Sequence, residues 1–128
     1  MQTKGRYRED RGEKIAMTYL LEMDMIHLQE DESKKFDFIA RFKDEPTKNI
    51  FIEVKTSQYT SSEIKKRYFP VMRRISRNSK QPALLLFINH RSGDGVFQVI
   101  KDNSVSDLIE LNTENLAKEI SHLKHINR

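Results

Sequence analysis

Apolar and polar residues alternate with a period of two over two neighbouring stretches, 36–42 and 49–56. Successive side chains of a β-strand point to opposite faces, so each stretch predicts a strand with one apolar face. About five residues join the two runs, and Pro46 among them breaks the ladder. We therefore predict an antiparallel hairpin.

The N-terminal third of the chain predicts one helix and one strand before this hairpin. Residues 1–8 are polar and basic, and we expect them to form a loose arm. Over 9–22 apolar residues recur at helical spacing, with Asp10 as the expected N-cap. The short apolar run 25–28 then predicts the first strand.

The part of the chain after the hairpin predicts two helices and two further strands. A helix is expected from Ser61 or Ser62 to about Arg77, and Pro70 should kink or divide it. The continuous apolar run 83–88 is typical of a strand buried on both faces.

Asp94-Gly95 predicts a hairpin turn into a strand at 96–100. A short helical piece is expected near 106–111, and a last helix with Thr113 as its N-cap.

The predicted order is thus helix, three strands, helix, two strands, helix, in one domain of residues 1–128. The strand–helix–strand unit over 50–88 should be a right-handed crossover between parallel strands. The expected fold class is α/β, a mixed β-sheet flanked by helices.

The composition limits the partners and the location that we expect for the protein. No apolar run approaches the roughly 20 residues that span a bilayer, so we expect no membrane partner. The chain has no cysteine, which fits a cytoplasmic location. A net charge of +4 favours a polyanionic partner.

Charged residues on the second hairpin strand are the first candidates for a site. Glu53 and Lys55 share a face there, and a hairpin centred on Pro46 would place Asp37 opposite Lys55, with Glu53 as its diagonal neighbour. A slip of one residue would send Asp37 to the other face. Burial of charges is costly unless they are paired or bind a metal.

Asp37 and Glu53 would supply carboxylate oxygens to Mg²⁺ or Mn²⁺, with the Val54 backbone carbonyl as a further ligand. Lys55 would then hold the attacking water and stabilise the phosphate during hydrolysis of a phosphodiester bond. The alternative is a cross-strand salt bridge on a solvated face. A second acid-x-Lys triplet, Glu63-Ile64-Lys65, is expected at the start of a polar helix, where it would have no partner strand.

Asp37 followed by Glu53-Val54-Lys55 on the next strand resembles the motif of the PD-(D/E)xK nuclease superfamily. The amino-acid sequence of 51–57 also looks like that of small nuclease-like domains of bacterial defence and mobile-element proteins. The resemblance covers roughly residues 9–89. It implies a restriction-endonuclease-like three-layer fold, Mg²⁺ dependence and a DNA substrate.

In this family a glutamate of the first helix often joins the metal site, and Glu13 is the matching position. A first-turn glutamate is also simply a good helix former near a positive dipole end. The chain departs from the pattern in having Phe36, not proline, before Asp37. We also expect no additional specificity domain.

The predicted second helix is strongly basic, and this is the candidate nucleic-acid-binding surface. Its basic residues are Lys65, Lys66, Arg67, Arg73, Arg74, Arg77 and Lys80. They would contact phosphates, and Tyr59 or Tyr68 could stack on a base. The plain alternative is a solvated helix face. The four histidines show no strong ligand pattern.

Two functions from different classes follow. The first is a Mg²⁺- or Mn²⁺-dependent endonuclease acting on DNA in a defence, repair or recombination system. The second is a catalytically silent module of the same fold that binds nucleic acid or a protein partner. RNA as substrate, and a homodimer or subunit of a larger assembly, stay open.

Overall fold

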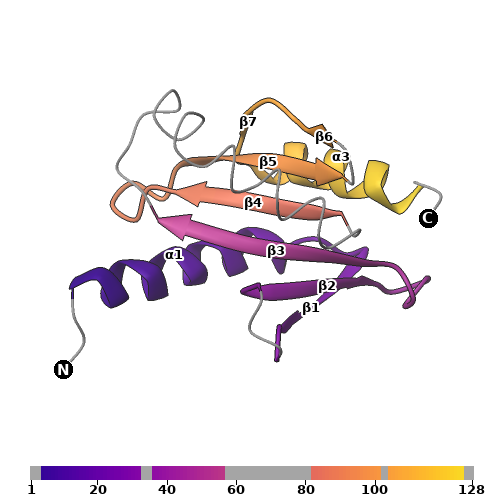
Figure 1. Ribbon diagram of the computed structural model, residues 1–128, viewed down its shortest axis with the longest axis horizontal. Coiled ribbons are helices and arrows are strands. Elements are labelled where there is room, and N and C mark those ends of the chain that lie inside the picture. The colour runs from indigo at the N-terminus through magenta and orange to yellow at the C-terminus, as the bar shows by residue number, and fades with distance from the viewer. Residues whose placement is uncertain (1–3, 33–35, 57–81, 102–103, 126–128) are drawn as a thin grey trace.

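A computed structural model describes residues 4–32, 36–56, 82–101 and 104–125, and Figure 1 shows their arrangement. Side chains are described from residue 10 onward. In chain order the elements are α1 (Lys4–Leu20), β1 (Ile26–Glu30), β2 (Phe38–Phe42), β3 (Asn49–Thr56), β4 (Ala83–Ile88), β5 (Gly95–Lys101), β6 (Ser104–Val105), β7 (Ile109–Glu110) and α3 (Thr113–Lys124).

The strands form one seven-stranded mixed sheet. Its order is β1-β2-β3-β4-β5-β6, with β7 also paired to β5. β3 and β4 are parallel, whereas every other pair in the sheet is antiparallel. The α/β class, the hairpin of β2 and β3 and the parallel pair that follows it are confirmed. The expected crossover helix lies in 57–81, outside the described residues.

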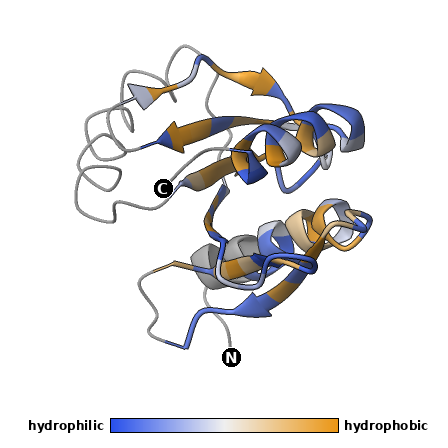
Figure 2. Ribbon diagram, turned by 90° about the vertical axis from the view of Figure 1, so that its right-hand side faces the viewer, coloured by the Kyte–Doolittle hydropathy of each residue, from blue (hydrophilic) through white to orange (hydrophobic). Residues whose placement is uncertain are grey.

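Both described helices contribute to one apolar cluster against a single face of the sheet. α1 supplies Ala16 and Leu20 to it, and the inward residues of β2, β3 and β4 lie in the same cluster. α3 contributes Leu116, Ile120 and Leu123. The strands carry long apolar stretches, while the helices carry both apolar and hydrophilic residues (Figure 2).

The opposite face of the sheet carries a second, smaller buried cluster. Its members are Ala83, Leu85, Phe87 and Ile100, on β4 and β5. Since β4 contributes to both clusters, all six of its residues are buried, as the continuous apolar run predicts. We call this second face, on which Glu53 and Lys55 also lie, the outward face.

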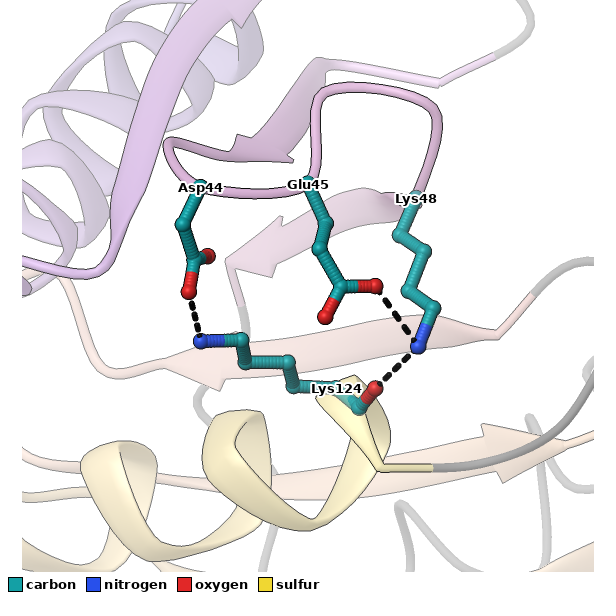
Figure 3. Close-up of polar contacts among 4 residues, drawn as sticks. All are labelled: Asp44, Glu45, Lys48 and Lys124. Atoms are coloured by element: carbon teal, nitrogen blue, oxygen red, sulfur yellow. Dashed lines mark hydrogen bonds and ion pairs between the residues drawn. The ribbon is translucent and has the colours of Figure 1, made fainter.

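The turn between β2 and β3 is fastened to the end of α3 (Figure 3). The Lys48 ammonium donates to the Lys124 backbone carbonyl at 2.7 Å and lies 2.9 Å from the Glu45 carboxylate. The Lys124 ammonium pairs with Asp44. The last carbonyls of a helix lack partners within the helix, and one in the last turn of α3 therefore receives a side-chain donor.

Several predicted boundaries need correction. α1 begins at Lys4, so most of the expected loose arm is helical and Asp10 lies inside the helix rather than capping it. The N-cap of α3 is Asn112, one residue before the predicted Thr113, and its side chain accepts from the Asn115 amide at 2.7 Å.

The helical piece expected over 106–111 is wrong. The chain there forms β7, which pairs with β5, because strand pairing at this end of the sheet outweighs the weak local helical pattern. None of the described helices has the length and apolar character needed to cross a membrane.

Candidate carboxylate site at the open end of the β2–β3 hairpin

Asp37 lies beside Glu53 at the end of the hairpin remote from its turn. The observed register pairs Phe38 with Ile52, so the next position along β2 falls next to Glu53. The predicted pairing of Asp37 with Lys55 is therefore wrong by two residues. The Phe42 amide bonds to the Lys48 carbonyl at 3.2 Å, which centres the turn on Glu45 rather than Pro46. A shift of two keeps the predicted face.

Hydrogen bonds to the backbone of β3 hold Asp37 in place. Its amide donates to the Ile52 carbonyl at 3.1 Å, and its carboxylate Oδ2 accepts from the Val54 amide at 2.7 Å. The side chain of Asp37 thus takes the place of a backbone acceptor where the ladder between the strands ends. A backbone N–H bonded to a carboxylate oxygen makes a strong hydrogen bond, so this contact fixes the position of the Asp37 carboxyl group.

Asp31, at the end of β1, closes the loop that carries Asp37. Its amide donates to the Asp37 carbonyl at 3.3 Å, and its carboxylate accepts from the Phe36 amide at 3.0 Å. Its exposed fraction is only 7%. Asp31 therefore holds the Phe36 amide with its side chain and the Asp37 carbonyl with its backbone amide.

A close approach of α1 to β3 brings Glu13 to the same place. Gly12 is buried, and a Cβ added there would lie 2.5 Å from the Thr56 Cγ2 methyl. Only a residue without a side chain lets the helix come this near to the end of β3. Glu13 follows directly, and its charge acts on Glu53.

The surroundings of Glu53 favour its protonated form. Burial is the largest cause, followed by a side-chain hydrogen bond with Asp37 and the charge of Asp37, and together they raise the pKa of Glu53 to about 8. Lys55 acts in the opposite direction, while Glu13 adds a smaller upward effect. The two carboxyl groups are therefore in hydrogen-bond contact, and this contact is one cause of the raised pKa of Glu53.

Lys55 extends the site along the same strand. It is exposed and lies two residues after Glu53, so both side chains are on the outward face. Val54 between them points into the core, with an exposed fraction of 9%.

The structure therefore brings Asp37, Lys55 and Glu13 within electrostatic range of Glu53. Among the described residues, no group of three or more His, Cys, Asp or Glu side chains is arranged to hold a metal ion. The whole predicted basic set, from Lys65 to Lys80, lies outside the described residues, as do Tyr59 and Tyr68.

Sequence reasoning missed Asp31 and Gly12. A lone glycine inside a helical pattern is a signal of close packing and could have drawn attention to Gly12. Asp31 lies in a polar turn where an aspartate is ordinary, and no pattern separates it from Glu30 or Glu32. No protein-family model matches the chain, and no curated protein matches it either.

Proposed function

We propose that this protein is a metal-dependent nuclease of the PD-(D/E)xK superfamily that hydrolyses phosphodiester bonds in DNA. The observation that carries the proposal is the pairing of two carboxyl groups, Asp37 and Glu53, with Lys55 on the same strand face. Burying two like-charged carboxylates is costly unless they are paired or bind a metal, so such a cluster indicates a functional site.

The donor set suits Mg²⁺ or Mn²⁺. Mg²⁺ prefers oxygen ligands and is often held by one or two carboxylates, the rest of its shell being water and substrate phosphate. Asp37 and Glu53 would provide the carboxylates, with the Val54 carbonyl and Glu13 as accessory ligands. The bound ion would lower the pKa of a water and neutralise charge on the phosphate.

The residues of the chain then have separate tasks. Asp37, fixed by the Val54 amide, holds the geometry. Glu53 would hold a cation as the ionised carboxylate, since a nearby positive charge favours that form. The exposed Lys55 ammonium is free to orient the attacking water and to stabilise the charge of the pentacovalent phosphate.

A specific observation also favours a second function, a module of the same fold that binds nucleic acid or a protein partner without cutting. Within the described residues the acidic side chains do not form a group of three around a common point. A site with two carboxylates binds a free cation weakly.

One experiment separates the two functions. Supercoiled plasmid, single-stranded DNA and RNA are incubated with the protein and Mg²⁺ or Mn²⁺, with a chelator as control. The nuclease predicts metal-dependent cutting that falls by about 10²–10³ in Lys55→Ala, since an electrostatic contact to the transition state is removed.

Lys118→Ala is the matched control, because Lys118 is also an exposed lysine but lies on α3. Equal loss in both variants would contradict the assigned role of Lys55. Salt-sensitive binding without cutting of any substrate would favour the silent module.

A further inference from the structure

The outward face of β1, β2 and β3 carries a polar, partly basic surface that leads to the carboxylate site. His27 pairs with Arg41 across β1 and β2, and Arg41 pairs with Asn49 across β2 and β3, so these three side chains lie in one row. His27 and Arg41 are exposed. The acidic residues on this face are Glu53 of β3 and Asp37, which directly precedes β2.

Phe51 lies between Asn49 of that row and Glu53 on β3, and its ring belongs to an aromatic pair. Phe36 and Phe51 are stacked, with ring centroids 4.6 Å apart and an interplanar angle of 15°. Both are half-buried, so part of each side chain remains open to solvent. Phe36 precedes Asp37 directly, and Phe51 lies two residues before Glu53 on the same face.

These features are arranged in the order in which a nucleotide strand would meet them. Arg41 is four residues from Asp37 along the direction of β2, which corresponds to roughly 13 Å. A strand with one phosphate at the carboxylates and another beside Arg41 would run alongside Phe51, one ring of the stacked pair. Arginine binds phosphate through several N–H donors, and an exposed aromatic ring stacks on a base.

We propose that this face binds a single nucleotide strand, with a base stacked on the Phe36–Phe51 pair and a phosphate bound by Arg41. The inference rests on the proposed function in taking the carboxylate site as the position of the cut phosphate. Single strands fit the rings because their bases can be unstacked, whereas duplex bases already stack on one another.

The test is binding without cutting, measured by fluorescence anisotropy in chelator. The probes are a labelled oligodeoxynucleotide, the same sequence as RNA, and the corresponding duplex DNA. A single strand, of either sugar, is expected to bind more tightly than the duplex. Phe36→Leu should weaken that binding about tenfold, because it keeps an apolar side chain but removes the stacking ring, and Phe36→Tyr should restore it.

Arg41→Gln should lower the slope of log K against log salt by about 0.7, as one phosphate contact is lost. Lys118→Gln is the matched control, since it removes an exposed charge from α3 on the other side of the sheet. Its salt slope and affinity should stay at the wild-type values. Circular dichroism checks that each variant is folded.

Three results would overturn the inference. They are duplex binding as tight as single-strand binding, an unchanged single-strand affinity in Phe36→Leu, or a change in Lys118→Gln as large as that in Arg41→Gln. A change of oligomeric state in Phe36→Leu, measured by light scattering, would also overturn it and would identify the face as an interface between copies. Lys55-dependent cutting with unchanged binding in Phe36→Leu refutes this inference alone. Single-strand binding that Phe36→Leu weakens, without cutting of any substrate, refutes only the proposed nuclease activity.

Discussion

Both ends of the β2–β3 hairpin carry acidic residues and lysines, but the surroundings of the carboxyl groups differ between the two ends. At the turn, Asp44 and Glu45 each face a lysine in an exposed ion pair, and the contact with Lys124 lowers the pKa of Asp44. At the open end, two carboxyl groups face each other, and burial raises the pKa of Glu53 to about 8.

The difference shows that residue type alone does not separate a structural ion pair from a candidate site. What separates them is whether each carboxylate has a cation of its own and whether water reaches it. Exposed pairs contribute about 0–1 kcal/mol and can be replaced, whereas a half-buried pair of acids opposes folding when ionised. A cluster of the second kind calls for a ligand.

The largest expected effect compares one aspartate from each end. Asp37→Asn keeps an oxygen to accept from the Val54 amide but removes the charge that would hold the metal. Under the proposed function, metal-dependent cutting should fall by about 10²–10³. Asp44→Asn should leave the rate of cutting unchanged. Equal rates for the two variants would remove the functional distinction between the ends.

The close contact of α1 with β3 gives the next effect. Gly12→Ala should lower the free energy of unfolding by about 1–3 kcal/mol, because its Cβ would lie 2.5 Å from the Thr56 methyl. Chemical denaturation measures this.

Thr56→Ser removes that methyl group and serves as the matched background. There, Gly12→Ala should become neutral or stabilising by up to about 1 kcal/mol, since alanine favours the helix. A penalty that persists in the Thr56→Ser background would show that the Thr56 methyl is not what excludes a side chain from position 12.

The dependence of stability on pH should differ in sign between the two ends. The pKa of Glu53 in the folded protein, about 8, is above its unfolded value of 4.5. Its contribution is thus fully present below about pH 4.5 and is lost as the pH rises to 8 and the group ionises.

Glu53→Gln places a neutral side chain at this position, so this variant does not lose that stability as the pH rises. Measured by denaturation at low salt without metal, wild type should weaken relative to Glu53→Gln by ~1–2 kcal/mol from pH 5 to pH 8, the partial exposure of Glu53 limiting the effect. A constant difference over this range would show that Glu53 is ionised throughout.

The smallest effect belongs to the turn. The pKa of Asp44 is lowered in the folded protein, so its contribution is present at neutral pH and is lost as the pH falls through that lowered pKa. Asp44→Asn should therefore differ slightly from wild type near pH 7 at low salt, and should match it in acid or at high salt. Thermal unfolding at two salt concentrations measures this.

The sequence predicts those features that depend on side-chain alternation within one element. β3 has the predicted bounds, β4 is buried throughout, and Asp37, Glu53 and Lys55 lie on the predicted face. Alternation fixes the face of a residue but not its partner, because register depends on turn geometry. Pro46 suggested the wrong centre for that reason.

Longer-range contacts are the part that the sequence does not predict. The strand at 109–110 forms because β5 offers an edge, a fact about neighbours rather than about local propensity. The hydrogen bonds of Asp31 with Phe36 and Asp37 likewise depend on how the chain folds back beside β1. The effect of Glu13 on Glu53 depends on the packing of α1, which only a family resemblance anticipated.

The contact between Lys48 and the carbonyl of Lys124 also bears on the order of events during synthesis. The two residues are 76 positions apart, so the hairpin leaves the ribosome well before Lys124 does. The hairpin can pair from its own residues early, yet its turn gains the ionic contacts with α3 only after α3 has emerged. A nascent chain truncated before α3 should consequently form the carboxylate end of the hairpin while the turn lacks its contacts with α3.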